Sequence, residues 1–474
     1  MHRLLKLTVT VAASLVAVAC SHRNRMDPVL AAYETGQYSV ASEALVPLLE
    51  DRRDSEKDRT IYELEAGAVY AAGGEIEKSI EAFGAADDRM WEYLDDAPEV
   101  RISEQAAAIL TNQTIINYFG RPHDRIMCCT YQGLNHLSRG DLEKAGVSFR
   151  RALEWQQDAV TKNEKEVEAL QERASADSKA EGYDSQRALE DERTKQGFES
   201  AYGPLRDMKG YGKFEIPYAV FLRAIHQQLL NRTDSLQQAT EGFRRTAGML
   251  SDEARDMVMK DAELAEQVTN GSTKLPPMVY VICESGMAPM LEELRIDIPL
   301  FIPSVPYVGA AFPVIKFREG APGPFRLRSG DASVPSVVLT DMDRVVAEEF
   351  NQRLPAIITM TLVSSATKAI ATAVAQQAAE QQGGNAALFI ALVGAVYQVS
   401  TNSADLRTWL TLPKQVQYAR LEAPASGSLE VELGDGQKIG PINVESGGTT
   451  LVHVRAPRAG VAPAVRTIRF PGTT

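Results

Sequence analysis

The chain has few cysteines, only four among its 474 residues. Cys20 stands alone near the start, Cys128 and Cys129 are adjacent, and Cys283 lies in a short apolar run. Adjacent cysteines rarely bond to each other because the geometry strains the peptide between them, so the sequence predicts no disulfide framework. We expect Cys128 and Cys129 to pack in a core as small apolar side chains. A bridge from Cys283 to either of them is an alternative that no local pattern supports.

Histidine is also scarce, and motifs that hold metals or nucleotides are missing. The six histidines are scattered without carboxylates or thiolates at metal-ligand spacing, and no HExxH, CxxC or Walker-type glycine loop occurs. Clusters of basic residues are missing too, and 63 acidic residues outnumber 50 basic ones for a formal net charge of −13. Because phosphate contacts need clustered positive charge, we expect no nucleic-acid partner, and we expect no metal and no cofactor.

Long apolar runs are few, and the first one lies at the start of the chain. Residues 7–19 follow a short basic segment and form an apolar stretch of about 13 residues, too short to cross a bilayer. The stretch ends in Ala-Val-Ala-Cys at residues 17–20, which resembles the lipobox of bacterial lipoproteins. That resemblance implies that residues 1–19 are a signal peptide and that Cys20 receives a diacylglycerol thioether and an acylated amino terminus. An ordinary secretory signal with an incidental cysteine is the alternative.

A lipid on Cys20 would determine the location of the protein independently of its fold. Each buried methylene contributes about 0.8 kcal/mol, so several acyl chains hold a soluble body on a membrane essentially permanently. By resemblance to enterobacterial sorting rules, Ser21 after the cysteine favours the outer membrane. We therefore expect a protein that is lipid-anchored to a bacterial membrane, at the outer membrane facing the periplasm.

An internal repeat organises the first half of the chain. Residues 60–88 and 126–153 carry glycine, aromatic and small residues at equal offsets. The matched positions are Gly67 with Gly133, Tyr70 with His136, Gly74 with Gly140, Ile76 with Leu142, Ser79 with Ala145, Phe83 with Phe149 and Ala86 with Ala152. Both copies resemble the tetratricopeptide repeat (TPR), in which small residues let two helices approach and an aromatic side chain fills the gap. Generic antiparallel helix pairs with the same apolar spacing are the alternative.

Further copies extend the pattern into an array. Residues 30–48 repeat the helix-turn-helix half, residues 218–247 form a weaker copy, and residues 89–124 are expected to supply another degenerate pair. Stacked repeats form a curved array whose concave surface binds extended peptides or partner helices. We expect this array over residues 20–270, with a charged insert at 156–200 that is a solvated helical arm or a disordered loop. Tyr70 and His136 are not assigned as site residues, because their positions pack between helices as often as they face a ligand.

The pattern changes after residue 270, where short apolar runs and alternating segments predict strands. These are residues 278–283, 296–302, 305–317, 336–339, 418–421, 428–433, 449–454 and 465–470. We therefore expect an α+β fold, with the TPR-like helical array followed by a mixed α/β module over 275–412. A small antiparallel β-sheet module follows over 413–474.

Two apolar segments of the α/β module have the composition of membrane spans. Residues 357–379 contain several hydroxyl side chains and Lys368, and residues 386–399 are shorter than the roughly 18 to 20 residues that a span requires. We interpret both as buried helices packed on the sheet. Membrane insertion and a partner-binding surface are the alternatives.

Three short stretches are similar to segments of a known protein family, and the similarity extends over nearly all of the chain after the signal peptide. They are Tyr-Gln-Gly-Leu-Asn at 131–135, Arg-Arg-Ala at 150–152 before a Trp-Gln pair, and Asp-Leu-Arg-Thr-Trp at 405–409 leading to Leu412-Pro413. With the order of the parts, they resemble a family of uncharacterised bacterial lipoproteins with TPR-like N-terminal repeats. That family brings no established catalytic residue, so the resemblance assigns no catalytic site.

One pair of residues has the spacing of a catalytic motif. Ser365 and Lys368 fit Ser-x-x-Lys, the nucleophile motif of penicillin-recognising enzymes, in which an amine activates the serine. In those enzymes the motif opens a helix and is supported by SDN-like and KTG-like elements. Here both elements are missing and Ser365 lies inside a helical run, so the sequence does not predict an enzyme.

These observations predict a non-catalytic, lipid-anchored cell-envelope protein that acts as a scaffold or adaptor for another envelope protein or peptide. Two alternatives remain open. One is an envelope serine hydrolase or peptidoglycan-active enzyme that uses Ser365 and Lys368. The other is a structural component of an envelope assembly or export machine.

Overall fold

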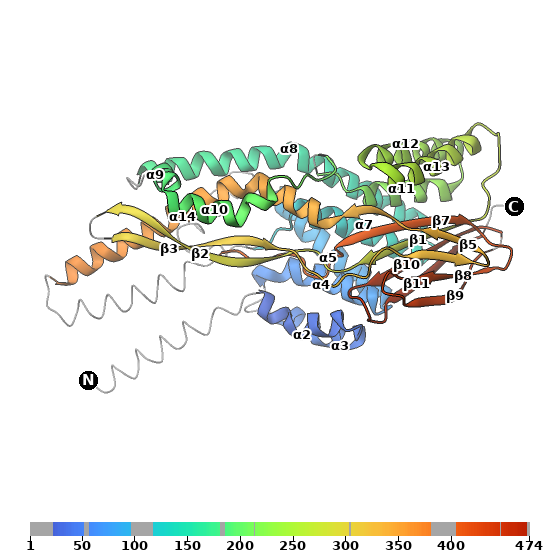
Figure 1. The fold of residues 1–474 in the computed structure, drawn as a ribbon, viewed down its shortest axis with the longest axis horizontal. Coiled ribbons are helices and arrows are strands. Elements are labelled where there is room, and N and C mark those ends of the chain that lie inside the picture. Colours follow the sequence, from blue (N-terminus) through green and yellow to red (C-terminus); the bar gives the residue numbers. More distant parts are fainter. Residues whose placement is uncertain are drawn as a thin grey trace.

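The computed structural model describes residues 22–51, 56–95, 117–180, 185–212, 214–302, 305–380, 404–445 and 447–471. Helices occupy most of the first half and strands most of the second, so the fold is mixed α+β, as the sequence predicts (Figure 1). Cys20, most of the predicted helical pair at 89–124 and the apolar segment at 386–399 lie outside the described residues.

Helix pairs with short turns build the first half. They are α2 (His22–Glu34) with α3 (Tyr38–Glu50), α4 (Arg59–Ala72) with α5 (Ile76–Asp95), α7 (Pro122–Ser138) with α8 (Leu142–Ala180), and α11 (Pro217–Leu230) with α12 (Thr233–Met249). Helix α13 (Asp252–Thr269) packs on α12, and short 3-10 turns lie at Glu56–Asp58 and Gly203–Leu205. The four pairs fall where the apolar spacing predicts helices.

The turns of the first three pairs share one geometry. Gly36, Gly74 and Gly140 have φ angles of 74°, 78° and 72°, a left-handed conformation that glycine adopts without steric cost at a helix end. In each turn the residue after the glycine donates its backbone N–H to a carbonyl five residues earlier. These bonds are Gln37 to Ala32 at 2.9 Å, Glu75 to Tyr70 at 2.8 Å and Asp141 to His136 at 3.0 Å.

Glycine also lets the helices of the two central pairs approach closely. A Cβ atom on Gly67 would lie 2.4 Å from Cε1 of Phe83, and one on Gly133 would lie 2.4 Å from Cε1 of Phe149. In both pairs a buried phenylalanine ring of the second helix therefore covers the glycine of the first. Residues that match between the two sequence copies therefore also make the same packing contact in the two helix pairs.

A five-stranded sheet joins segments that are far apart in the chain. Its order is β11 (Ala464–Phe470), β10 (Thr449–Ala456), β1 (Met278–Ser285), β7 (Gln415–Glu422) and β6 (Val337–Asp341). Strands β1 and β10 are parallel, while the other neighbours are antiparallel, so the sheet is mixed and not purely antiparallel. Because β1 pairs with β7 and β10, the sheet combines strands from both sides of the boundary that the sequence pattern suggests between residues 412 and 413.

The two faces of this sheet have different partners. Tyr280 and Ile282 belong to the core that the sheet shares with the helices, whereas Val281 and Cys283 face a second sheet. The second sheet is antiparallel, in the order β5 (Ala332–Pro335), β4 (Arg326–Ser329), β8 (Ser428–Glu432) and β9 (Lys438–Asn443). Cys283 therefore lies on the opposite side of the sheet from Cys128 and Cys129. All three thiols are free and buried, which confirms that they pack in cores.

An elongated arm extends from this body (Figure 1). It contains the long hairpin of β2 (Met290–Ile302) and β3 (Val305–Lys316), the far part of α8, and the helices α9 (Ser185–Glu190), α10 (Glu192–Tyr202) and α14 (Met342–Glu380). The charged insert predicted as a helical arm or a loop is helical in its described part.

Helix α14 packs on β3 and on α8. It therefore lies against the hairpin, and not mainly against the five-stranded sheet. Among the described residues it is the one helix long and apolar enough to cross a membrane by composition, over Met342–Val374, and 50% of its most apolar window is buried in the protein.

Candidate functional site

The inner surface of the helices, where the sequence predicts partner binding, is largely occupied by the five-stranded sheet. The Tyr418 hydroxyl donates to Asp261 of α13 at 2.6 Å, and Gln228 of α11 donates to the Tyr280 hydroxyl at 2.7 Å. Glu65 of α4 accepts the backbone N–H of Leu410 at 2.6 Å. The helices, the sheet and the segment at Leu410 are therefore joined here by buried hydrogen bonds within the protein.

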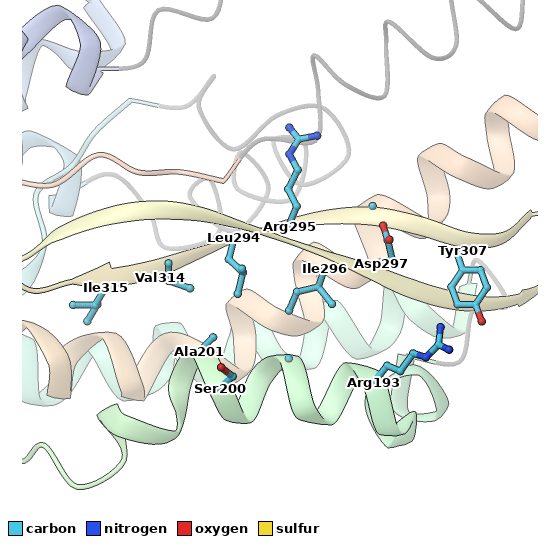
Figure 2. Close-up of a pocket in the computed structure, with 12 residues that line it drawn as sticks. Arg193, Ser200, Ala201, Leu294, Arg295, Ile296, Asp297, Tyr307, Val314 and Ile315 are labelled. Carbon is cyan, nitrogen blue, oxygen red and sulfur yellow. The ribbon is translucent and has the colours of Figure 1, made fainter.

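An open groove of about 860 Å³ lies between α10 and the β2–β3 hairpin (Figure 2). Four residues of α10 and eight of the hairpin line it. They are Arg193, Gly197, Ser200 and Ala201, and Leu294, Arg295, Ile296, Asp297, Tyr307, Gly309, Val314 and Ile315.

The alternation of side chains along β2 creates the apolar floor of this groove. Successive residues of a strand point to opposite faces, and Figure 2 shows Leu294 and Ile296 pointing toward α10 while Arg295 points away from it. Further along the strand, Ile298 and Leu300 continue the apolar series and are buried in the arm. The floor of the groove therefore continues the arm's own apolar core.

Small residues on α10 keep this floor from being covered. Gly197 lies so close to β2 that a Cβ atom on it would stand 3.2 Å from Cδ1 of Ile296. One turn further, Ser200 and Ala201 present short side chains to the same strand. Leu294 and Ile296 stay partly exposed as a result.

Polar groups form the rim of the groove. Figure 2 shows the side chains of Arg193 and Tyr307 converging at the end of the groove nearer the hairpin tip. Tyr307 is 54% exposed, which is unusual for so large a ring. On the opposite face of the strand, Arg295 pairs with Glu293 at 2.9 Å.

The hairpin also offers unpaired strand edges. Among the described residues, β2 and β3 pair only with each other, so the outer edge of each strand lacks a neighbouring strand. A strand edge without a neighbouring strand is a template onto which an extended peptide can add as a further strand. The groove and the edges together fit an extended polypeptide better than a compact small molecule.

Ser365 and Lys368, the catalytic pair of the hydrolase alternative, are buried in the arm. Ser365 is 2% exposed and Lys368 is 5% exposed, and both lie within α14 where it packs on the hairpin. Burial lowers the pKa of Lys368 to about 8. The pair therefore combines an amine of reduced basicity with a serine that is almost inaccessible to solvent among the residues that the structure describes. Ser285, the last residue of β1, is also buried, and its hydroxyl donates to the Pro322 carbonyl at 2.7 Å.

Tyr70 and His136 lie in separate helix pairs, as their repeat positions require. The Lys78 ammonium lies 5.4 Å from the centre of the Tyr70 ring, and burial lowers the pKa of His136. Within the described part of the chain, no group of three or more His, Cys, Asp or Glu side chains is arranged to hold a metal ion.

Sequence reasoning did not find the groove, although part of its signal is local. Leu294, Ile296, Ile298 and Leu300 alternate with Arg295, Asp297 and Pro299, which indicates that one face of β2 is apolar. However, α10 covers this face only in part, and this depends on how segments distant in the chain pack, which the sequence pattern does not show.

A scan against protein-family models finds no match to the chain, and searches of curated proteins and of solved structures find none either. The function proposed below therefore rests on this chain's own residues and geometry.

Proposed function

We propose that the protein is a non-catalytic adaptor of the bacterial cell envelope. A lipid on Cys20 holds it on the outer membrane, and the groove between α10 and the β2–β3 hairpin binds an extended segment of another envelope protein. The resemblance of its helix pairs to tetratricopeptide repeats and of its start to a lipoprotein signal supports this proposal.

The observation that carries the proposal is the combination of an open groove with a hairpin whose described strands have no other neighbouring strand. An extended peptide gains main-chain hydrogen bonds by adding to a strand edge, and alternate side chains then fall into pockets beside the strand. Leu294 and Ile296 offer apolar contact for such side chains, and Arg193 and Tyr307 offer polar contact at one end.

The helical half then serves as a rigid support. Helix α8 starts in the second central pair and continues for 39 residues into the arm, a length of about 58 Å at 1.5 Å per residue. An element of this length couples the groove mechanically to the body of the protein. The membrane anchor would fix the body, and the arm would present the groove at a distance from it.

The test is an in-cell crosslinking pull-down with the full-length protein and the variant Ser200→Arg. Ser200 is exposed and lines the groove, so an arginine there blocks the floor without entering the core. Gln196→Arg adds the same charge to an exposed position of α10 that does not line the groove, and it serves as the matched control. We expect Ser200→Arg to lose the crosslinked partner and Gln196→Arg to retain it. Equal partner recovery from both variants would refute the groove assignment.

A Cys20→Ser variant tests the location separately. We expect it to leave the membrane fraction and to lose the partner, because the groove would no longer be held at the membrane where the partner is. A stoichiometric complex that survives detergent extraction would instead favour a structural component of an envelope machine.

A further inference from the structure

A second cavity, unrelated to the groove, lies between the helices and the five-stranded sheet. It has a volume of about 220 Å³. Residues of α2, α4 and α7 form one wall, and residues of β1, β10 and β11 form the other. The cavity therefore lies in the body of the protein, where the helical half and the sheet meet.

Arginine side chains outnumber carboxylates among the residues that line this cavity. Among its lining residues, Arg455 and Arg466 carry guanidinium groups and Glu284 is the one carboxylate. Glu284 already has three partners: it accepts the hydroxyls of Tyr131 at 3.2 Å and Tyr218 at 3.0 Å, and it lies 3.0 Å from Nε2 of His453. Burial acts to raise the pKa of Glu284, but these neighbours and Arg455 outweigh it and hold the pKa below its usual range. The carboxylate therefore stays ionised and compensates one of the two positive charges.

Arg455 is held rigidly, yet its hydrogen bonds end on neutral atoms. Its Nε donates to the Tyr33 hydroxyl at 3.0 Å, and its Nη1 donates to the Glu284 and Gly286 carbonyls at 3.1 and 2.7 Å. Its Nη2 donates to the Met287 sulfur at 3.0 Å and to the Thr411 carbonyl at 3.2 Å, so every N–H of the guanidinium has an acceptor within the protein. The side chain is 4% exposed, so these contacts orient a buried cation without neutralising it.

Arg466 has an unsatisfied donor. Its Nη1 donates to Oδ1 of Asn135 at 2.9 Å, whereas its buried Nε has no hydrogen-bond partner. Burial lowers the pKa of Arg466, in keeping with a charge that its surroundings compensate poorly. A buried donor without an acceptor costs about 1 to 3 kcal/mol, and more for a charged group. A ligand oxygen in the cavity would remove that cost.

We propose that this cavity binds a carboxylate group carried on a small aliphatic body, which accepts a hydrogen bond from Arg466 while Arg455 adds a second positive charge beside it. The planar donor fork of arginine matches a carboxylate in geometry. The excess of positive charge among the lining side chains favours an anionic ligand. Small aliphatic side chains, those of Ala68, Ala71, Ala72 and Val465, offer apolar contact for the rest of the ligand.

The size of the cavity limits what can enter. A volume near 220 Å³ corresponds to about seven water molecules at roughly 30 Å³ each. That space admits a short aliphatic acid or the last residue of a polypeptide with its terminal carboxylate. Both ligands present a carboxylate next to a small apolar group, and titration of the protein with each of them distinguishes the two.

The experiment is isothermal titration calorimetry of the full mature chain with butyrate, butyramide and inorganic phosphate. N-acetyl-alanyl-alanine and its C-terminal amide form the peptide arm. We expect butyrate, the free-acid peptide or both to bind, and the matching amides to bind at least about tenfold more weakly. Binding of the peptide alone assigns the ligand to a polypeptide C-terminus. Equal binding of acid and amide, phosphate binding as tight as carboxylate, or no binding of any carboxylate would overturn the proposal.

Variants then locate the site. Arg466→Gln removes the uncompensated charge, and Arg469→Gln removes an exposed arginine of the same strand that does not line the cavity. We expect Arg466→Gln to weaken carboxylate binding about tenfold or more and Arg469→Gln to leave it unchanged. Ala464→Leu, which fills the cavity without altering charge, is expected to weaken binding as well. Wild-type affinity in both Arg466→Gln and Ala464→Leu would place the site elsewhere, and each variant is first checked for native circular dichroism.

Discussion

The substitution Gly67→Ala tests the packing that defines the central helix pairs. An added Cβ would lie 2.4, 2.5 and 2.6 Å from three carbons of the Phe83 ring, well inside van der Waals contact. The ring cannot easily retreat, because it stacks on Tyr131 at 5.7 Å between centroids and meets Trp409 at 5.7 Å. Overpacking of this kind costs about 1 to 3 kcal/mol, while alanine in a helix gains about 1 kcal/mol over glycine. Since the ring is confined, we expect a net loss of about 1 to 2 kcal/mol in the free energy of unfolding.

Two further glycines make the test specific. Gly133→Ala meets Phe149 at the same 2.4 Å and is expected to destabilise the protein as well. Gly248→Ala, in α12, meets nothing within 4 Å and is expected to stabilise the protein by about 0.5 to 1 kcal/mol. Urea unfolding followed by far-ultraviolet circular dichroism compares the three variants with the wild type. If Gly67→Ala were as stable as the wild type, Phe83 would not cover Gly67 and the equivalence of the two pairs would be refuted.

Three other predictions follow from burial. Burial raises the pKa of Glu65 from 4.5 to about 7, so the folded state binds a proton that the unfolded state releases between these values. The free energy of unfolding should therefore fall as pH rises through this window, by up to about 1.4 kcal/mol per pH unit, and Glu65→Gln should flatten the slope measured in urea; an unchanged slope contradicts the assignment. Burial also raises the pKa of Cys128 and Cys129, and that of Cys283 to about 12. A thiol reagent should then modify none of the three in the folded protein and all of them after unfolding in guanidinium, and rapid reaction before unfolding would disprove their burial. Fluorophosphonate and β-lactam probes should leave Ser365 unmodified because it is 2% exposed; a covalent adduct at Ser365 would support the hydrolase alternative.

The helix pairs could be predicted because their signals are local. Left-handed glycines at positions such as Gly74 and Gly140 end one helix, and apolar residues at helical spacing define the next. Strands such as β1 could be predicted because a buried strand is a short apolar run. The burial of Cys128 and Cys129 followed from their apolar neighbours. The hydroxyl side chains and Lys368 within residues 357–379 favoured a helix packed in the protein, and half of the most apolar window of α14 is buried.

The pairing of strands could not be predicted in the same way. The sequence of β1 is compatible with pairing to β2, which follows it in the chain. It is equally compatible with the observed pairing to β7 and β10, which come from the end of the chain. Consecutive strands are neighbours more often than not, so the sequence pattern favours two separate modules at residues 275–412 and 413–474. The observed sheet instead combines both, because the buried faces of β1 and β10 are completed by the helices on one side and by the second sheet on the other.

The sequence by itself determined where most of the described helices and strands form and which thiols are buried, because backbone sterics and side-chain periodicity act over a few residues. Only the tertiary structure decided that the sheet covers the inner face of the helices, that Ser365 and Lys368 are enclosed, and that a groove opens beside β2. It also decided that Arg466 and Glu284 face one cavity. These outcomes depend on distant segments meeting and excluding water together, and no local stretch of sequence contains that information.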